Sequence, residues 1–230
     1  SVMTGRMPFN VGFYGDGEDQ HIANFTTTAQ VLKDHGGYET HCIGKWDVGY
    51  VVKETTPTYK GFDSFFGYYK ACNDDLFYHS TGTCDKDAQS DPIDLSRNTG
   101  SKFEAARGYR GQYSTRLFKD EALSHIRRHA QTNDSAPLYL YVAPQNVHLA
   151  CGTKDSKLKQ GIQAPCETVR LFDRVTNDTF KAQSAVTTEL DYLVGNITET
   201  LKSYEGLWEN TLIVRLSLSL SLLSYGKFTS

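Results

Sequence analysis

The sequence contains no C-x-x-C pair, no excess of basic residues and no apolar run of the length that a membrane span needs. Without C-x-x-C spacing, a structural zinc site is not expected. Lysine and arginine number 24 against 27 acidic residues, so the formal net charge is −3. The basic surface that nucleic-acid binding requires is therefore not expected, and the apolar stretch near the C-terminus is too short to cross a bilayer. We expect neither a nucleic-acid partner nor a membrane span.

The rest of the composition is typical of a globular protein. The chain has 230 residues, of which 39% are hydrophobic, 22% charged and 12% aromatic. This length is enough to bury a sizeable core and favours a single domain. The aromatic residues suit a carbohydrate-facing surface, but packing in the core explains them equally well.

Five cysteines suggest an oxidising environment. Cys72 and Cys84 bracket one polar loop, and Cys151 and Cys166 bracket another. Bonds that close these two loops would fit both pairs and would be typical of a secreted protein. Cys42 lies in an apolar-polar alternation, so we predict that it is a free, buried residue of a strand.

Four N-x-S/T sequons support the same compartment. Single sequons arise often by chance, whereas four of them beside paired loop cysteines favour the secretory pathway. No signal peptide is visible, and a start signal would lie ahead of Ser1. The predicted glycosylation sites are Asn24, Asn133, Asn177 and Asn196.

Hydrophobic periodicity predicts helices that alternate with buried strands. The clearest amphipathic stripe steps by three or four residues from Ala182 to Leu201. The predicted order is a helix that starts near Thr26-Thr27-Thr28 and is closed by Gly36-Gly37, a strand over 38–43, a helix over 114–131, a strand over 137–142, a helix over 182–201 and the beginning of a strand at 211–214.

This alternation predicts an α/β fold with a mostly parallel sheet flanked by helices. Two polar stretches, 68–112 and 150–178, are predicted to be long irregular excursions. In α/β folds such loops gather at the carboxyl ends of the strands, where ligands bind. Ser-Leu repeats begin at Leu216. Their alternation is compatible with an extended strand, but the abrupt change of composition favours a wrong exon boundary or a translated intron.

Six short motifs occur in one order along the chain. They are Thr4-Gly5-Arg6-Met7-Pro8, Gly44-Lys45-Trp46, Gly61-Phe62-Asp63-Ser64-Phe65-Phe66-Gly67, Pro144-Gln145-Asn146-Val147-His148, Val194-Gly195-Asn196-Ile197-Thr198 and Gly206-Leu207-Trp208-Glu209-Asn210-Thr211. One such motif is weak, whereas the ordered set is specific. The arrangement resembles the sulfatase family, and most closely the arylsulfatase B-like, N-acetylgalactosamine-4-sulfatase branch.

The resemblance implies a sulfuric ester hydrolase of the alkaline phosphatase/sulfatase-like fold. Such an enzyme removes sulfate from sulfated glycans such as glycosaminoglycans, depends on calcium, and is lysosomal or secreted. Its nucleophile is a formylglycine made from a cysteine that precedes the T-G-R motif, which would lie ahead of Ser1. Residues 215–217 occupy the place of a calcium-binding Asp-Asn pair. The resemblance therefore predicts a partial catalytic domain over 1–214, incomplete at both ends and inactive alone, with a divergent tail over 215–230 and no calcium ligand.

Three residues are the predicted site. Lys45 matches the family lysine that contacts the sulfate and the formylglycine, and His148 matches a histidine that donates to a sulfate oxygen or to the leaving group. Both follow strands, where an anion would lie. Asp47 stands in place of a family histidine, and its carboxylate would repel an anionic transition state unless it turns to a metal or to Lys45.

Other polar residues are predicted to be structural. The Asp63 carboxylate is expected to fix a turn by accepting hydrogen bonds from backbone amides. Arg6 is expected to support the loop that carries the formylglycine. The histidines other than His148, including His125 and His129, are predicted to be solvated.

Two other functional hypotheses remain open. The departure at Asp47 fits a secreted glycan-binding relative without catalysis. The tail fits an incomplete gene model with no separate function.

Overall fold

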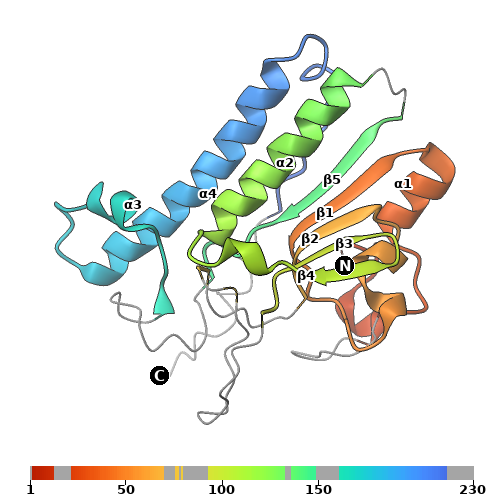
Figure 1. Cartoon of the computed structure of the whole chain (residues 1–230), viewed down its shortest axis with the longest axis horizontal. Helices are drawn as coiled ribbons and strands as arrows, with labels where there is room; N and C mark the ends of the chain where they lie inside the picture. The colour runs from red at the N-terminus through yellow and green to blue at the C-terminus, as the bar shows by residue number, and fades with distance from the viewer. Residues whose placement is uncertain are drawn as a thin grey trace, which may run out of the picture.

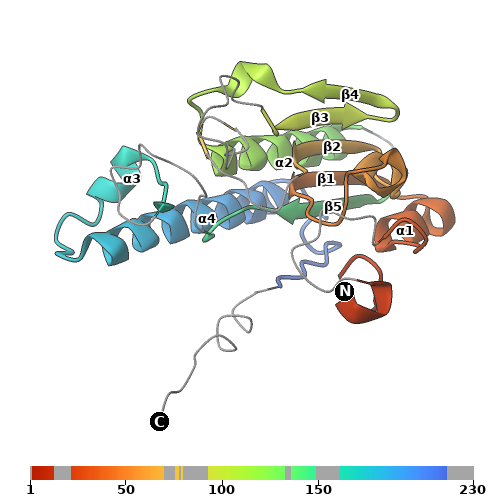
Figure 2. The same cartoon turned by 90° about the horizontal axis from the view of Figure 1, so that it is seen from below.

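The computed structural model describes residues 2–12, 22–69, 76–77, 79, 93–132, 136–148 and 161–216. In these residues a five-stranded sheet has the strand order β4-β3-β2-β1-β5, with helices packed beside it (Figures 1 and 2). The strands are β1 (Glu39–Lys45), β2 (Ser64–Tyr68), β3 (Ser96–Thr99), β4 (Lys102–Ala105) and β5 (Leu138–Ala143). The α-helices are α1 (Thr28–Gly36), α2 (Ser114–Gln131), α3 (Cys166–Arg170) and α4 (Asp178–Lys202).

The strand directions combine a parallel core with an antiparallel edge. β1 lies between β2 and β5 and is parallel to both, with Gly44 opposite Gly67 on one side and Ala143 on the other. β3 and β4 continue the sheet in antiparallel pairings. The parallel strands bring the carboxyl ends of β1, β2 and β5 to one edge of the sheet.

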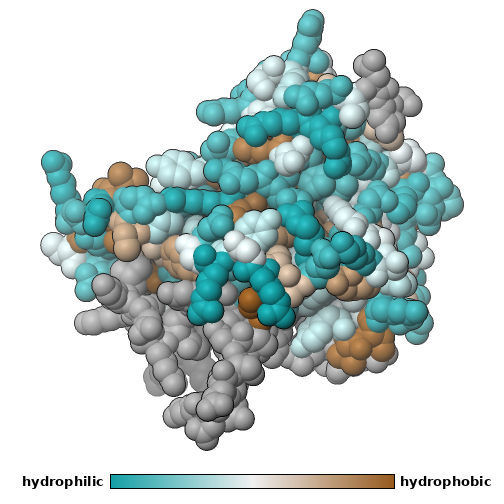
Figure 3. Space-filling model, viewed as in Figure 1, coloured by the Kyte–Doolittle hydropathy of each residue, from teal (hydrophilic) through white to brown (hydrophobic). Residues whose placement is uncertain are grey.

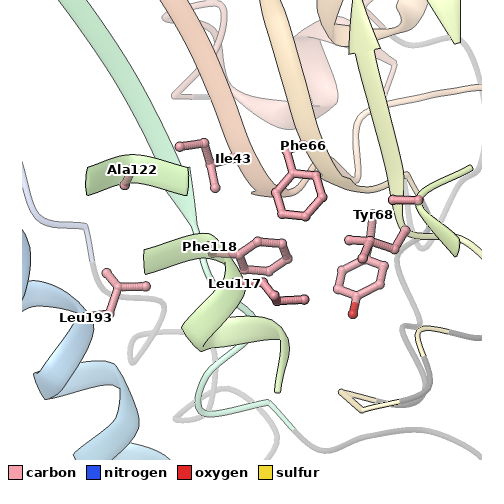
Figure 4. Close-up of a cluster of buried hydrophobic side chains, with 9 residues drawn as sticks. Ile43, Phe66, Tyr68, Leu117, Phe118, Ala122 and Leu193 are labelled. Atoms are coloured by element: carbon pink, nitrogen blue, oxygen red, sulfur yellow. The ribbon is translucent and has the colours of Figure 1, made fainter. Parts of the chain in front are cut away.

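Helices cover both faces of the sheet, as the alternation of β1 side chains shows. Ile43 belongs to a core cluster shared with Phe66 of β2, Phe118 of α2 and Leu193 of α4 (Figure 4). The neighbouring Cys42 points to the opposite face, into a cluster that includes a residue of α1. α2 and α4 run side by side (Figure 1), and hydrophilic side chains predominate on the face of the molecule that carries them (Figure 3).

Local signals set the ends of the helices. Thr27 caps α1 in a capping box with Gln30, and Gly37 ends it in a left-handed conformation with φ of 65°. α2 spans the predicted range, and α4 contains the predicted stripe with a few further residues at each end. The predicted strands over 38–43 and 137–142 are confirmed as β1 and β5, within two residues at each end.

Three local predictions were wrong. The stretch 68–112 contains β3 and β4, which give no apolar alternation because β4 is exposed along its whole length. The stretch 150–178 contains the short helix α3. Residues 211–216 form no strand; Leu212 is 88% exposed, and no described strand lies beside it to complete its backbone hydrogen bonds.

No helix in the described part of the chain is both long enough and apolar enough to cross a membrane. The tail from residue 217 onward lies outside the described residues.

Candidate functional site

Lys45 is the last residue of β1 and is held between two fixed neighbours. Gly44 precedes it with φ of 100°, a conformation that favours glycine. Trp46 follows it and is 2% exposed. Its indole Nε1 donates to the backbone oxygens of Gly49 and Thr55 at 2.9 and 3.0 Å. The lysine backbone is therefore fixed at the edge of the sheet, while its side chain remains 24% exposed.

Asp47 forms an ion pair with Lys45. The carboxylate Oδ2 lies 3.1 Å from the lysine Nζ. Asp47 has φ of 56°, so the segment is not extended, and strand alternation does not place the side chains of residues 45 and 47 on one face. The left-handed turn brings the carboxylate to the ammonium instead. Since both side chains are partly exposed, such a pair contributes at most about 1 kcal/mol to stability.

Glycines allow β1 to approach both of its neighbours closely at this edge. A Cβ built on Gly44 would lie 2.1 Å from the carbonyl oxygen of Ala143, and one built on Gly67 would lie 1.8 Å from the carbonyl oxygen of Gly44. Both distances are far below normal contact. Gly44 of the G-K-W motif and Gly67, the last residue of the G-F-D-S-F-F-G motif, are therefore required for the strand spacing beside Lys45.

His148 lies in the turn that follows β5. Its backbone N–H donates to the carbonyl oxygen of Gln145 at 2.7 Å, and its side chain is exposed. The residues before it are anchored: Asn146 Nδ2 donates to the carbonyl oxygen of Val186 at 2.8 Å, and its Oδ1 accepts from Thr115 of α2. This turn is therefore tied to both α2 and α4.

Lys45 and the turn that carries His148 lie at the same edge of the sheet. Gly44 pairs with Ala143 in the parallel register of β1 and β5, and Lys45 and this turn come directly after these two paired residues in the chain. Adjacent carboxyl ends of parallel strands are a common location for ligands in α/β folds. The individual roles of Lys45, His148 and Asp47 stay predictions.

Comparison with known proteins decides the family. Residues 1–217 match the model of the sulfatase family. The chain belongs to the sulfatase family. Arylsulfatase J of Mus musculus is 31% identical over 188 residues, covering 82% of this chain and 28% of the relative. An arylsulfatase of Hemicentrotus pulcherrimus is 27% identical over 172 residues, covering 67% of this chain and 29% of the relative. The chain thus spans less than a third of these curated relatives.

Solved structures show the same fold. Ps i-CgsB, crystallised in complex with k-i-k-neocarrahexaose, superposes with a TM-score of 0.67 at 20% identity over 88% of this chain and 43% of its own. PsFucS1 sulfatase from Pseudoalteromonas sp. gives a TM-score of 0.59 at 20% identity over 86% of this chain and 41% of its own. The predicted α/β fold of the alkaline phosphatase/sulfatase type is confirmed.

Asp63 of this sulfatase-family chain joins β1 and α1 instead of fixing its own turn as predicted. Its carboxylate accepts from the Thr40 backbone N–H at 2.8 Å and from Lys33 Nζ at 2.6 Å. Although burial raises the pKa of this carboxyl, the hydrogen bonds from Lys33 and Thr40 outweigh burial, and the pKa lies below its usual value. Arg6 is exposed, with its guanidinium 5.2 Å from the ring centre of Phe25.

Two of the five cysteines, Cys42 and Cys166, lie within the described residues. Cys42 is a buried free thiol of β1, as predicted, and burial raises its pKa well above the usual value. Cys166 is an exposed free thiol in the structure, which differs from the predicted bond at this residue. Its predicted partner Cys151, and the predicted pair Cys72 and Cys84, lie outside the described residues, so the bond between Cys72 and Cys84 stays a prediction.

Three of the four predicted glycosylation sites are described. Asn24 and Asn177 are exposed, and Asn177 also caps α4 by accepting from the backbone of Phe180 at 3.1 Å. Asn196 is half-buried within α4, and its Nδ2 donates to the carbonyl oxygen of Tyr192 at 2.7 Å. Asn133 lies outside the described residues.

The described residues contain no cluster of three or more His, Cys, Asp or Glu side chains that could hold a metal ion. They therefore do not fit a calcium ion by themselves. The calcium dependence implied by the sulfatase resemblance stays a proposal for the protein that contains this chain.

One expectation about histidines was wrong. His125, His41 and His79 were expected to be solvated, but they are only 6%, 3% and 1% exposed. His125 and His41 lie between α2 and β1. The sequence did carry a signal for this: His125 lies one residue before Ile126, on the buried face of the α2 stripe. His41 precedes the buried Cys42, and their side chains point to opposite faces of β1. Because helices cover both faces of the sheet, both side chains are buried.

Proposed function

We propose that the protein containing this chain is a sulfuric ester hydrolase in which Lys45 and His148 contact the substrate. The observation that supports this most directly is that Lys45 and the turn with His148 lie at the same edge of the sheet. In a chain of the sulfatase family, β1 and β5 place a lysine and a histidine-bearing turn at adjacent carboxyl ends. A cationic ammonium can neutralise a sulfate oxygen, and an imidazolium can protonate a leaving alcohol.

The proposed substrate is a sulfated glycan, and the proposed subtype is arylsulfatase B-like, with glycosaminoglycans as the glycan class. Relatives of this chain carry the name arylsulfatase, and Ps i-CgsB was crystallised with an oligosaccharide. The sequons and the loop cysteines support a lysosomal or secreted glycoprotein with disulfide bonds. In the intact protein, calcium would supply positive charge beside the sulfate and the formylglycine nucleophile.

The test is activity of the protein that contains this chain, assayed with an aryl sulfate and with sulfated glycosaminoglycan oligosaccharides. Lys45→Ala and His148→Ala are each expected to lower kcat/KM by roughly a hundred-fold or more. Lys102→Ala is the matched control, because this lysine is 68% exposed on β4 and pairs with Glu104 on the same strand. Activity that survives both site substitutions would contradict the proposed roles.

One observation supports a second candidate, a glycan-binding relative without catalysis. The Asp47 carboxylate forms an ion pair with the ammonium of Lys45 at 3.1 Å. It would therefore compete with a sulfate group for this ammonium. Binding of sulfated oligosaccharides without any release of sulfate, by protein produced with its complete catalytic domain, would establish this alternative.

A further inference from the structure

Two histidines stack face to face between β1 and α2. The imidazole rings of His41 and His125 have their centres 3.7 Å apart and their planes 24° apart. Both side chains are almost fully buried. They lie on β1 before Lys45 and on the C-terminal half of α2, so they are separate from the proposed sulfate site.

The hydrogen bonds around the pair are consistent with two neutral rings. One guanidinium nitrogen of Arg128 (Nη2) lies 3.1 Å from His41 Nε2 and 3.2 Å from His125 Nδ1. Because a guanidinium can only donate, this nitrogen favours acceptors on both rings, and its two N–H groups are shared among these ring nitrogens and Glu39. The remaining nitrogens face acceptors: His41 Nδ1 lies 2.7 Å from the Ser64 hydroxyl, and His125 Nε2 lies 3.4 Å from Glu121 Oε1.

The charges around the rings already balance without a proton on either ring. Glu121 accepts two hydrogen bonds from Arg97 of β3, at 2.6 and 2.8 Å. Glu39 of β1 is bound by Arg128. Two carboxylates therefore face two guanidinium groups. Glu39 Oε1 also lies 3.0 Å from His41 Nε2 and would favour a proton there, but that proton would oppose Arg128 and the stacked ring.

We propose that the His41–His125 stack is an acid-sensitive latch that holds α2 against the sheet at neutral pH. Protonation of His41 removes an acceptor from Arg128 and adds a buried cation to a balanced cluster, in contact with the stacked ring of His125. Acidification therefore loosens the contact between α2 and β1.

The pH window follows from the direction of the pKa shift. Burial, followed by the neighbouring His125, lowers the pKa of His41 to about 4, against about 6.5 in an unfolded chain. The stabilisation is complete above about pH 6.5 and is lost as the pH falls towards 4, because only the unfolded chain binds the proton in this interval. Over the whole window the unfolding constant would rise by about 300-fold for this one group.

Glu121 responds in a different window. Burial raises the pKa of its carboxyl, but hydrogen bonds from His125 and Arg97 outweigh burial and lower it to about 2. Its contribution is present above the unfolded pKa of about 4.3 and is lost only below it. Loss of stability between pH 6.5 and 5 therefore reports on His41 and not on this carboxylate.

The experiment is urea unfolding of the 230-residue chain at pH 7.5 and pH 5.0. The unfolding constant is expected to rise by roughly 10- to 30-fold on acidification. The double variant His41→Gln/His125→Gln removes the titrating groups, so its unfolding constant should change by less than about three-fold. His35→Gln is the matched control, because His35 is exposed near the end of α1, and it should keep the full response. An equal response in the double variant and the control would overturn the latch.

Amide hydrogen exchange of the unmodified chain provides a test if the double variant does not fold. After correction for intrinsic exchange, protection along α2 should fall between pH 7.5 and 5.0, while protection along α1 should stay nearly constant. Uniform change in both helices, or no change in α2, would overturn the proposal. Neither measurement depends on sulfatase activity, so failure here is distinguishable from failure of the proposed function.

Discussion

Arg116 and Glu189 form a two-pronged ion pair that joins α2 to α4. Arg116 Nε lies 2.9 Å from Oε2 of Glu189, and Nη2 lies 2.6 Å from Oε1. The glutamate side chain is only 1% exposed, whereas that of the arginine is 39% exposed. Arg116 also contacts Glu167 of α3 at 2.6 Å. One arginine therefore connects three helices, and Glu189 depends on it because a buried carboxylate requires a partner.

Glu189→Gln is expected to lower the free energy of unfolding by about 2 kcal/mol, because Arg116 and Thr168 lose the carboxylate that both contact. The expected loss is moderate since Arg116 remains partly solvated. Urea unfolding measures it. The control is Asp173→Asn, which removes an exposed pair with Lys181 and should change stability by less than about 0.5 kcal/mol. Equal effects in the two variants would show that burial of Glu189 contributes nothing.

Gly67→Ala is expected to destabilise the chain by about 3 kcal/mol or to prevent folding. The added Cβ would lie 1.8 Å from the carbonyl oxygen of Gly44, so β1 and β2 would have to separate beside Lys45. Thermal unfolding measures the change. Gly195→Ala is the control, because a Cβ there meets nothing within 4 Å. Since Gly195 lies within α4, this variant should be stabilised by about 0.5 to 1 kcal/mol.

Asp47→His is expected to raise kcat of the protein that contains this chain by roughly a hundred-fold on a sulfated substrate. The substitution removes the carboxylate that pairs with Lys45 and adds a donor to the anion. Histidine tolerates the positive φ of this position better than most residues. Asp47→Asn separates the two effects, because it removes the charge without adding an imidazole. An unchanged or lower kcat for Asp47→His would assign Asp47 a role of its own.

Peptide mapping of secreted protein without reduction is expected to show Cys72 bonded to Cys84. The closed loop should contribute roughly 3 kcal/mol to stability. Cys42 should resist alkylation until the chain unfolds, because it is buried and its thiol pKa is raised. A bridge that includes Cys42, or an unlinked loop pair, would show that the pairing is wrong.

The sequence alone determined the features whose causes lie within a few residues. The cap at Thr27 and its partner Gln30 are three residues apart, so the beginning of α1 is encoded locally. The apolar stripes of α2 and α4 predicted both helices, because burial of one helix face repeats every three or four residues. The position of Lys45 directly after a buried strand was likewise visible, as was the family through its ordered motifs.

Only the tertiary structure decided the contacts between distant segments. β4 carries no periodic signal because it is exposed along its whole length at the edge of the sheet, and β3 contains no apolar residue that would reveal a buried face. The bond between Arg116 and Glu189 crosses 73 residues of sequence. The stack of His41 on His125 forms because α2 crosses the face of β1 at the level of that residue. The position of His125 on the apolar stripe of α2 was a sequence signal for burial, but only the packing of the helix on the sheet determines that His41 is its partner.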